Sequence, residues 1–187
     1  MKLPVRFCLP FFFCLAVLPV SAQNRQDGRH TVYAELLGNA YTWSVNYDYL
    51  VYRDSRIKLS AGAGFGYVPF RSLKGPAVPL QLTLMYHRET AHHLEIGTGI
   101  TYFNLTTQQR SPDMQSTVSN TRDYFILSPR IGYSYRKPGG GLFLRAAVLP
   151  SFRVSPLGTD ISSAEKDAFL FARTFSVWCG IGAGYTF

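Results

Sequence analysis

Apolar and polar side chains alternate with a period of two residues along much of the chain, most clearly in its last stretch, Arg173 to Phe187. One series of alternate residues there is apolar, and the other consists mostly of small or polar residues. The apolar series is Phe175, Val177, Cys179, Ile181, Ala183, Tyr185 and Phe187. A period of two is that of a β-strand with two unlike faces, so this stretch is predicted to be a strand.

Seven further segments show the same alternation and are separated by residues that favour turns. They are Thr31–Gly38, Tyr41–Val51, Ile57–Val68, Val78–Arg88, His93–Asn104, Tyr124–Arg136 and Leu142–Phe152. With the terminal stretch they make about eight strands, the small end of the range for membrane barrels. The aromatic content of 15% and the 16 glycines also suit strands better than helices, so the chain is predicted to be all-β.

The connections between these segments alternate in length. The short ones are Tyr52–Arg56, Glu89–His92 and Lys137–Gly141, and the longer ones are Pro69–Ala77, Leu105–Asp123 and Arg153–Ala172. Outer-membrane barrels alternate in this way because short turns face the periplasm and longer loops face outside. The first connection, Asn39-Ala40, is tight where a longer loop is expected, and a bulge in a longer first strand is one explanation.

Side-chain volume decides which face of such a barrel is inside. A soluble barrel such as a lipocalin encloses its apolar face, whereas a membrane barrel turns that face to lipid. A small closed barrel has room inside only for side chains, so large residues on every strand would not fit. The series opposite the apolar one is rich in glycine: Gly62, Gly64, Gly66, Gly97, Gly99, Gly132, Gly180, Gly182 and Gly184. We therefore predict an antiparallel up-and-down transmembrane β-barrel with a polar interior.

Charged residues share the inner series with these glycines, and we expect them to form a structural network inside the barrel. An unpaired charge buried there would cost several kcal/mol, so each must find a partner. The acidic members are expected to pair with the two arginines, with the lysine as a further candidate. The predicted network consists of Glu35, Asp48, Lys58, Glu95, Arg130 and Arg145.

The outer series carries aromatic residues that suit the two membrane interfaces. They are Trp43, Tyr47, Tyr49, Tyr86, Tyr102, Tyr133, Tyr135 and Tyr185. The alternative is that they form the core of a soluble β-sandwich. The 19 Lys and Arg outnumber the 11 Asp and Glu, but no dense basic block is present, so no nucleic-acid partner is predicted. Anionic outer-membrane lipids and lipopolysaccharide are the expected partners of the scattered basic groups.

The first residues have the pattern of a secretory signal peptide. Lys2 and Arg6 precede the apolar run Phe7–Val20, and Val20-Ser21-Ala22 offers a small-residue cleavage site. The run is short for a membrane-spanning helix. Residues 1–22 are therefore expected to be cleaved, and residues 23–187 are expected to form one barrel in the cell outer membrane.

Several short motifs, taken in their order, resemble an uncharacterised family of small outer-membrane barrel proteins of Bacteroidetes-type bacteria. They are Glu35-Leu36-Leu37-Gly38-Asn39, Ser44-Val45-Asn46-Tyr47-Asp48, Val78-Pro79-Leu80, His93-Leu94-Glu95-Ile96-Gly97-Thr98-Gly99, Pro129-Arg130-Ile131-Gly132-Tyr133-Ser134-Tyr135, Gly139-Gly140-Gly141-Leu142-Phe143-Leu144-Arg145-Ala146 and Gly184-Tyr185-Thr186-Phe187. The resemblance implies the barrel fold and the outer-membrane location, and it implies no activity. Leu37 stands where a second glycine of that pattern is expected, so the first turn departs from it.

The chain's last residues also resemble the assembly signal of outer-membrane barrels. A terminal strand that ends on an aromatic residue is unusual for a soluble protein, whose termini tend to be exposed and frayed. The alternate residues Ile181, Ala183, Tyr185 and Phe187 are the expected signal. The barrel-assembly machinery is therefore an expected partner.

The histidines are the best candidates for chemistry, and they do not favour it. A hydrolytic site needs a histidine within hydrogen-bond reach of its nucleophile, yet His87, His92 and His93 lie near one predicted periplasmic turn, opposite the lipid A leaflet. The pair His92-His93 could bind a metal, but adjacent strand residues point to opposite faces, so a solvated turn is favoured. No catalytic, cofactor or metal site is predicted, and the protein is not expected to be an enzyme.

The preferred function is that of a structural or interaction barrel with Leu105–Asp123 and Arg153–Ala172 as its outer contact surface. The alternatives are a narrow pore, a lipid-modifying barrel and an accessory subunit of an envelope secretion machine. A soluble periplasmic ligand binder of the lipocalin kind is the remaining alternative.

Overall fold

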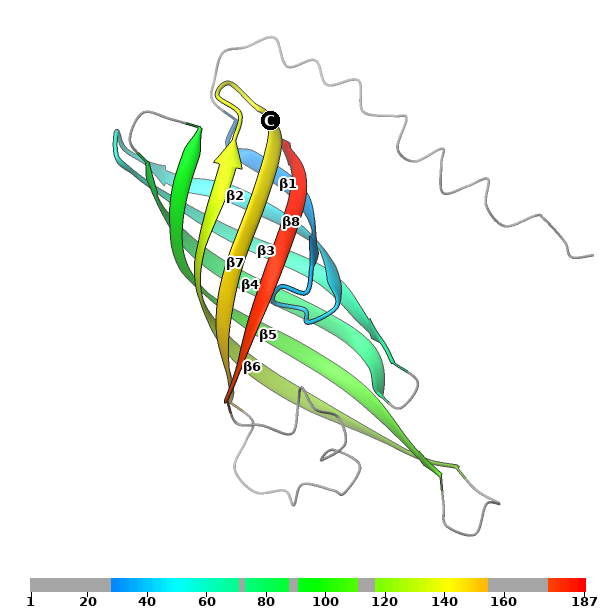
Figure 1. The fold of residues 1–187 in the computed structure, drawn as a ribbon. Helices are drawn as coiled ribbons and strands as arrows, with labels where there is room; N and C mark the ends of the chain where they lie inside the picture. Colours follow the sequence, from blue (N-terminus) through cyan, green and yellow to red (C-terminus); the bar gives the residue numbers. More distant parts are fainter. Residues whose placement is uncertain (1–27, 71–72, 88–90, 111–116, 155–174) are drawn as a thin grey trace, which may run out of the picture.

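The computed structural model describes residues 28–70, 73–87, 91–110, 117–154 and 175–187 as a closed barrel of antiparallel strands. Each strand pairs with the next, and β8 closes on β1 (Figure 1). The predicted fold class, an all-β up-and-down barrel of eight strands, is confirmed. The strands are β1 (His30–Leu36), β2 (Trp43–Arg53), β3 (Ile57–Pro69), β4 (Leu73–His87), β5 (His92–Arg110), β6 (Thr117–Arg136), β7 (Gly141–Arg153) and β8 (Phe175–Thr186).

The described residues include no helix long and apolar enough to cross a membrane. The predicted signal peptide, residues 1–22, lies outside the described part of the chain. The last strand is tied to the first at the chain ends, because the backbone N–H groups of His30 and Phe187 each donate to the other's carbonyl at 2.9 and 2.8 Å. This reciprocal pair extends the β1–β8 ladder beyond Thr31 and Thr186 to the last residue of the chain.

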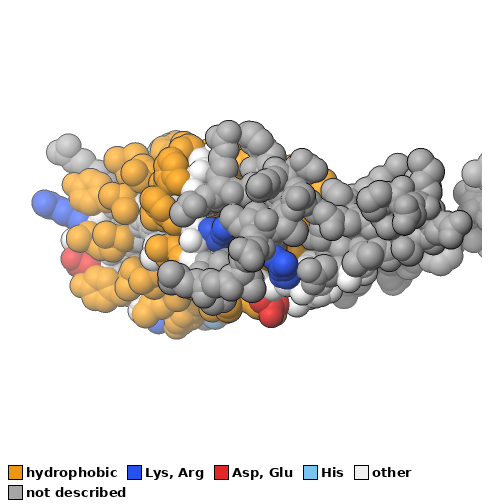
Figure 2. All heavy atoms as spheres, turned by 90° about the horizontal axis from the view of Figure 1, so that it is seen from below, with side chains coloured by type: hydrophobic (Ala, Val, Ile, Leu, Met, Phe, Trp, Pro, Cys, Tyr) orange, Lys and Arg blue, Asp and Glu red, His pale blue; other side chains and the backbone are white. Residues whose placement is uncertain are grey.

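The two faces of the wall are inverted relative to a soluble barrel. Ile131 is 65% exposed, while its neighbour Arg130 is 2% exposed, and Ile96 at 63% adjoins the fully buried Glu95. Figure 2 shows hydrophobic side chains covering much of the visible described surface. The period of two therefore turns the apolar series outward and the polar series into the lumen.

The strands reach further than predicted at the end of the barrel opposite the chain termini. β4 begins at Leu73, so most of the predicted long connection Pro69–Ala77 is strand. β5 continues to Arg110 and β6 begins at Thr117, so the predicted loop Leu105–Asp123 is largely a two-stranded ribbon. These two loop predictions were wrong, because the extensions are mostly polar or contain Gly and Pro, so they lack an apolar alternation. Most of the third predicted loop, Arg153–Ala172, lies outside the described residues.

The first connection spans residues 37–42 rather than Asn39-Ala40, because β1 ends at Leu36 and β2 begins at Trp43. Leu37 and Tyr41 adopt left-handed backbone conformations with φ of 66° and 64°. A bulge in the first strand does not explain this turn, because β1 pairs with β2 and with β8 without a register shift. A register shift does occur between Leu50 and Tyr52 of β2, near the connection to β3.

The first turn folds into the lumen. Gly38, Asn39, Ala40 and Tyr41 are all buried, and in Figure 1 the hairpin of β1 and β2 ends well short of the β5–β6 ribbon. Glycines of the wall make the space, because a Cβ atom added there would meet the turn. Such a Cβ would lie 2.7 Å from Gly38 Cα at Gly180, 2.9 Å from Asn39 Nδ2 at Gly99 and 2.9 Å from Ala40 Cβ at Gly66.

Candidate functional site

Arg145 is the centre of a polar network in the middle of the lumen. Its Nε lies 2.8 Å from Oε2 of Glu95, and its Nη2 lies 3.3 Å from Oδ2 of Asp48. Its Nη1 donates a hydrogen bond of 2.7 Å to the hydroxyl of Tyr33. All four side chains are buried, so these pairs lie in a medium of low dielectric constant where a broken pair is costly. Strand parity places them all on the inner series.

A second ion pair lies beside the first turn. Nη2 of Arg130 is 3.1 Å from Oε1 of Glu35, and both side chains are at most 2% exposed. The other oxygen of Glu35 accepts a hydrogen bond of 3.4 Å from the backbone N–H of Asn39. Glu35 therefore connects the β6 arginine to the turn that occupies the lumen.

Amide side chains join the two ion-paired groups. Nε2 of Gln81 donates to Oδ1 of Asp48 at 2.7 Å, and Oε1 of Gln81 accepts from Nδ2 of Asn39 at 3.2 Å. The carbonyl of Asn39 accepts from the hydroxyl of Thr101 at 3.1 Å. The network thus runs from β2 through β4 to the first turn and fills the middle of the lumen.

The structure brings together every member of the predicted interior set except Lys58, namely Glu35, Asp48, Glu95, Arg130 and Arg145. Lys58 is half-buried nearer the end that holds the chain termini, with Nζ 3.5 Å from Nε2 of His93. Sequence reasoning missed Tyr33, Gln81 and Arg136, although each falls on the inner series of its strand. The alternation of inner and outer residues along each strand was enough to place them inside the barrel.

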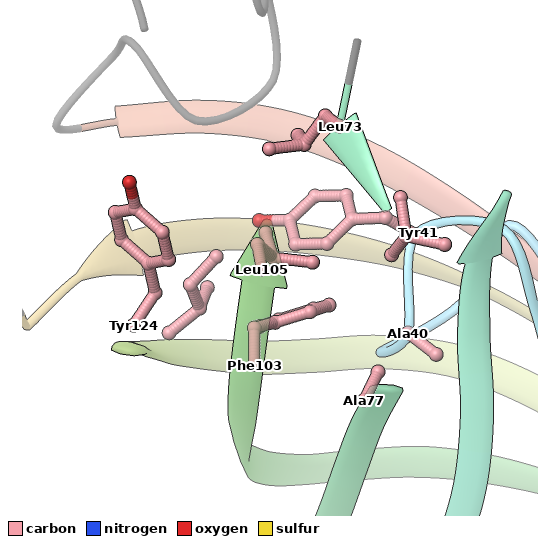
Figure 3. Close-up of a cluster of buried hydrophobic side chains, with 9 residues drawn as sticks. Ala40, Tyr41, Leu73, Ala77, Phe103, Leu105 and Tyr124 are labelled. Atoms are coloured by element: carbon pink, nitrogen blue, oxygen red, sulfur yellow. The ribbon is translucent and has the colours of Figure 1, made fainter. Parts of the chain in front are cut away.

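The lumen beyond the first turn is apolar, which corrects the prediction of a polar interior throughout. Figure 3 shows Tyr41 of the turn pointing among side chains from β4, β5 and β6. Its ring lies 5.6 Å from that of Phe103 and 5.4 Å from that of Trp178, between centroids. The buried cluster consists of Ala40, Tyr41, Val68, Leu73, Ala77, Phe103, Leu105, Tyr124 and Ile126.

Where the first turn leaves the wall, side-chain hydrogen bonds replace part of the backbone ladder. The β1–β8 ladder extends to Leu36 opposite Ile181, and β8 continues along β7 to Phe175. Side-chain bonds continue where the β1–β8 ladder stops: the indole N–H of Trp178 donates to the carbonyl of Leu37. Thr42 donates through its hydroxyl to the carbonyl of Tyr67 at 2.8 Å.

The two adjacent histidines of β5 lie on opposite faces of the barrel wall. His92 and His93 both lie on β5 and point to opposite faces, with His92 exposed beside the Tyr133 hydroxyl and His93 2% exposed. The prediction of a solvated turn was therefore wrong for His93. Within the described ranges, no three His, Cys, Asp or Glu residues are grouped so that they could hold a metal ion.

Scans against protein-family models and curated proteins find no match to this sequence. The barrel is similar in shape to the N-terminal β-barrel domain of OprF from Pseudomonas aeruginosa, with 11% identity and a TM-score of 0.49 over 87% of this chain and 100% of that chain. It is also similar to Ail, the attachment invasion locus protein of Yersinia pestis, with 14% identity and a TM-score of 0.48 over 86% and 97% of the two chains. Neisserial surface protein A follows with 14% identity and a TM-score of 0.43 over 85% and 96%.

These likenesses concern the barrel shape alone, and nothing about activity or partners transfers from them to this chain. The comparisons lend no support to the narrower resemblance to a Bacteroidetes-type family.

Proposed function

We propose that this protein is an integral outer-membrane β-barrel that acts as a structural or interaction component, with its interior plugged by its own first turn. The inversion of the two faces is the observation that carries the proposal. Burying the ion-paired network while exposing leucine, isoleucine and valine around the wall is favourable only when the surroundings of the wall are apolar.

The height of the apolar belt supports a membrane location. Outward apolar residues run from Leu94 to Tyr102 on β5 and from Phe125 to Tyr135 on β6. Tilted strands need about 9–11 residues to cross a bilayer core, which these stretches match. Beyond the belt, β6 turns the charged side chain of Asp123 outward, where it accepts hydrogen bonds of 2.7 Å from Tyr102 and Asn104.

Aromatic residues at both limits of the belt are placed to anchor it at the two interfaces, as tyrosine and tryptophan do in membrane proteins. Those near the chain termini are Tyr47, Tyr49, Tyr86, Tyr133 and Tyr185, and those at the other limit include Tyr67, Tyr102, Phe125, Phe152 and Phe175. Lipids and lipopolysaccharide are the proposed surroundings of this wall, and the strand end Ile181, Ala183, Tyr185 and Phe187 is the proposed contact for the barrel-assembly machinery.

The filled lumen favours an interaction role over conduction. Arg145, Asp48 and Glu95 occupy the middle of the lumen. The turn at Asn39 and Tyr41 occupies the part of the lumen that is farther from the chain termini. The ribbon of β5 and β6 protrudes instead (Figure 1), and its outer part carries threonine, serine and asparagine side chains. This polar ribbon is the proposed contact surface for partners outside the cell.

Gel mobility of the detergent-extracted protein, with and without boiling, tests the membrane proposal. A folded outer-membrane barrel keeps its compact form in detergent until heated, so two bands are expected from isolated outer membranes. Recovery of the protein in the soluble periplasmic fraction, with a single band, would overturn the proposal. Planar-bilayer recordings of the same preparation are expected to show no steady conductance, and a reproducible open channel would replace the interaction role with a pore.

A further inference from the structure

Arg136 is a buried cation without an ion-pair partner of its own among the described residues. It lies on β6 at the end of the lumen that holds the chain termini and is 8% exposed. Its Nη1 donates to the hydroxyl of Thr31 at 3.1 Å, and its guanidinium carbon lies 4.8 Å from the centroid of the Phe143 ring. Its Nε and Nη2 find no acceptor among the described residues. Buried donors normally have an acceptor, so two unpartnered guanidinium nitrogens require an explanation.

The buried carboxylates cannot supply that acceptor, because their ion pairs are with other arginines. Glu35 pairs with Arg130, while Asp48 and Glu95 both pair with Arg145. The charges of Glu95 and Asp48 still attract Arg136, but the charge of Arg145 repels it. Arg136 therefore lies at this end of the lumen with hydrogen-bond capacity that the central network leaves unused.

More positive charge gathers at the same end of the lumen. Lys58 on β3 is half-buried, and its ammonium is repelled by both Arg53 and Arg136. Two residues along β3, the buried hydroxyl of Ser60 also has no hydrogen-bond partner in the described structure. The exposed rim adds Arg53, Arg56 and Lys137. Holding like charges together inside a protein is unfavourable unless something of opposite charge compensates them.

We propose that the mouth of the barrel nearest the chain termini binds a small oxyanion, with Arg136 and Lys58 as its principal ligands and Ser60 as a further donor. The guanidinium plane presents Nε and Nη2 side by side, the geometry that matches two oxygens of a phosphate, sulfate or carboxylate. The ammonium of Lys58 adds a point charge, and the rim cations raise the local concentration of anions. The site does not depend on the proposed membrane location, which the gel-mobility test addresses separately.

Calorimetric titration of the refolded full chain in a zwitterionic detergent tests this site. Inorganic phosphate, sulfate and acetate are added at constant ionic strength, with chloride as the reference anion. Saturable binding of an oxyanion, with a matching rise in the temperature at which the folded gel band is lost, is the expected result. The same titration with a short-chain phosphatidic acid separates the two sources of the oxyanion: binding of inorganic phosphate supports a free anion, and binding of phosphatidic acid alone would replace it with a lipid headgroup.

Three variants assign the site. Arg136→Met and Lys58→Gln are each expected to weaken binding by about tenfold or more, since each removes charge-assisted hydrogen bonds. Lys74→Gln removes an exposed cation of β4 at the opposite end of the barrel and is expected to leave the affinity within about twofold of the wild type. If Arg136→Met does not fold, the comparison of Lys58→Gln with Lys74→Gln decides. Equal binding in those two variants, or no oxyanion binding above the chloride reference, would overturn the proposal.

Discussion

Arg145 on β7 and Asp48 on β2 meet inside the barrel with Nη2 and Oδ2 3.3 Å apart, although 97 residues separate them in the chain. The same guanidinium holds Glu95 of β5 through its Nε at 2.8 Å. One side chain therefore connects strands on different sides of the wall. This cross-connection resists collapse or shear of the barrel in a way that neighbouring backbone ladders alone do not.

Replacing Arg145 with leucine is expected to destabilise the barrel by about 3–5 kcal/mol, because two buried carboxylates lose their cation. Equilibrium unfolding by urea in detergent, followed by gel mobility, measures the change. Lys137→Leu, which removes an exposed cation on the connection between β6 and β7, serves as the control and is expected to shift stability by less than about 1 kcal/mol. The triple variant with Asp48→Asn and Glu95→Gln is expected to recover part of the loss. Equal effects of Arg145→Leu and Lys137→Leu would contradict the central role of Arg145.

The strand period and the glycines of the inner series were enough to predict the closed barrel, its inverted faces and most of the interior charges. The same reasoning left Arg136 out of the interior set, because a basic residue at the end of a strand and next to Lys137 is usually exposed to solvent. It also left out Tyr33 and Gln81, which bridge charges that the sequence alone does not place in space. Local pattern fixes which face a residue points to, whereas partners across the lumen depend on register around the whole barrel.

The inward course of the first turn could not be predicted for a related reason. Nothing in residues 37–42 alone marks the turn as buried, and its space comes from Gly66, Gly99 and Gly180 on three other strands. Those glycines were interpreted as room for charged side chains. The departure at Leu37 did indicate an unusual turn, and its φ of 66° bears this out.

A bulky residue at Gly180 is expected to drive the first turn out of the lumen, because even a Cβ there would lie 2.7 Å from the backbone Cα of Gly38. Gly180→Val should therefore lower the temperature at which the folded gel band is lost and expose residues 37–42 to added protease. Ala183→Val, on the outward face of the same strand, is the matched control and is expected to change neither. Protection of the turn in Gly180→Val equal to that in the wild type would show that the turn does not need this space.

Substitutions at Phe103 and Phe125 compare how much the buried apolar cluster and the outer wall each contribute to stability. Phe103 is fully buried beside Tyr41, whereas Phe125 of the neighbouring strand is 41% exposed on the outer wall. Phe103→Ala is expected to cost about 3–5 kcal/mol, since it leaves a cavity in a packed cluster. Phe125→Ala removes the same ring from a surface that lipid or detergent can refill, so its effect on urea unfolding should be much smaller. Matching losses from the two substitutions would mean that the cluster contributes no more than the lipid-facing wall.

A charge placed on the outer wall is expected to separate a membrane barrel from a soluble one. Ile131 lies within the apolar belt of β6 and is 65% exposed, so Ile131→Arg would put a charged group into lipid at a cost of about 2–4 kcal/mol near the midplane. In water the same substitution on so exposed a residue would be nearly neutral. Ser119→Arg, on the same strand and face but beyond the belt at Asp123, is the control and should leave insertion unchanged in either case. Refolding yield into lipid vesicles measures both variants, and only a membrane barrel gives a yield that falls for Ile131→Arg while Ser119→Arg stays at the wild-type level.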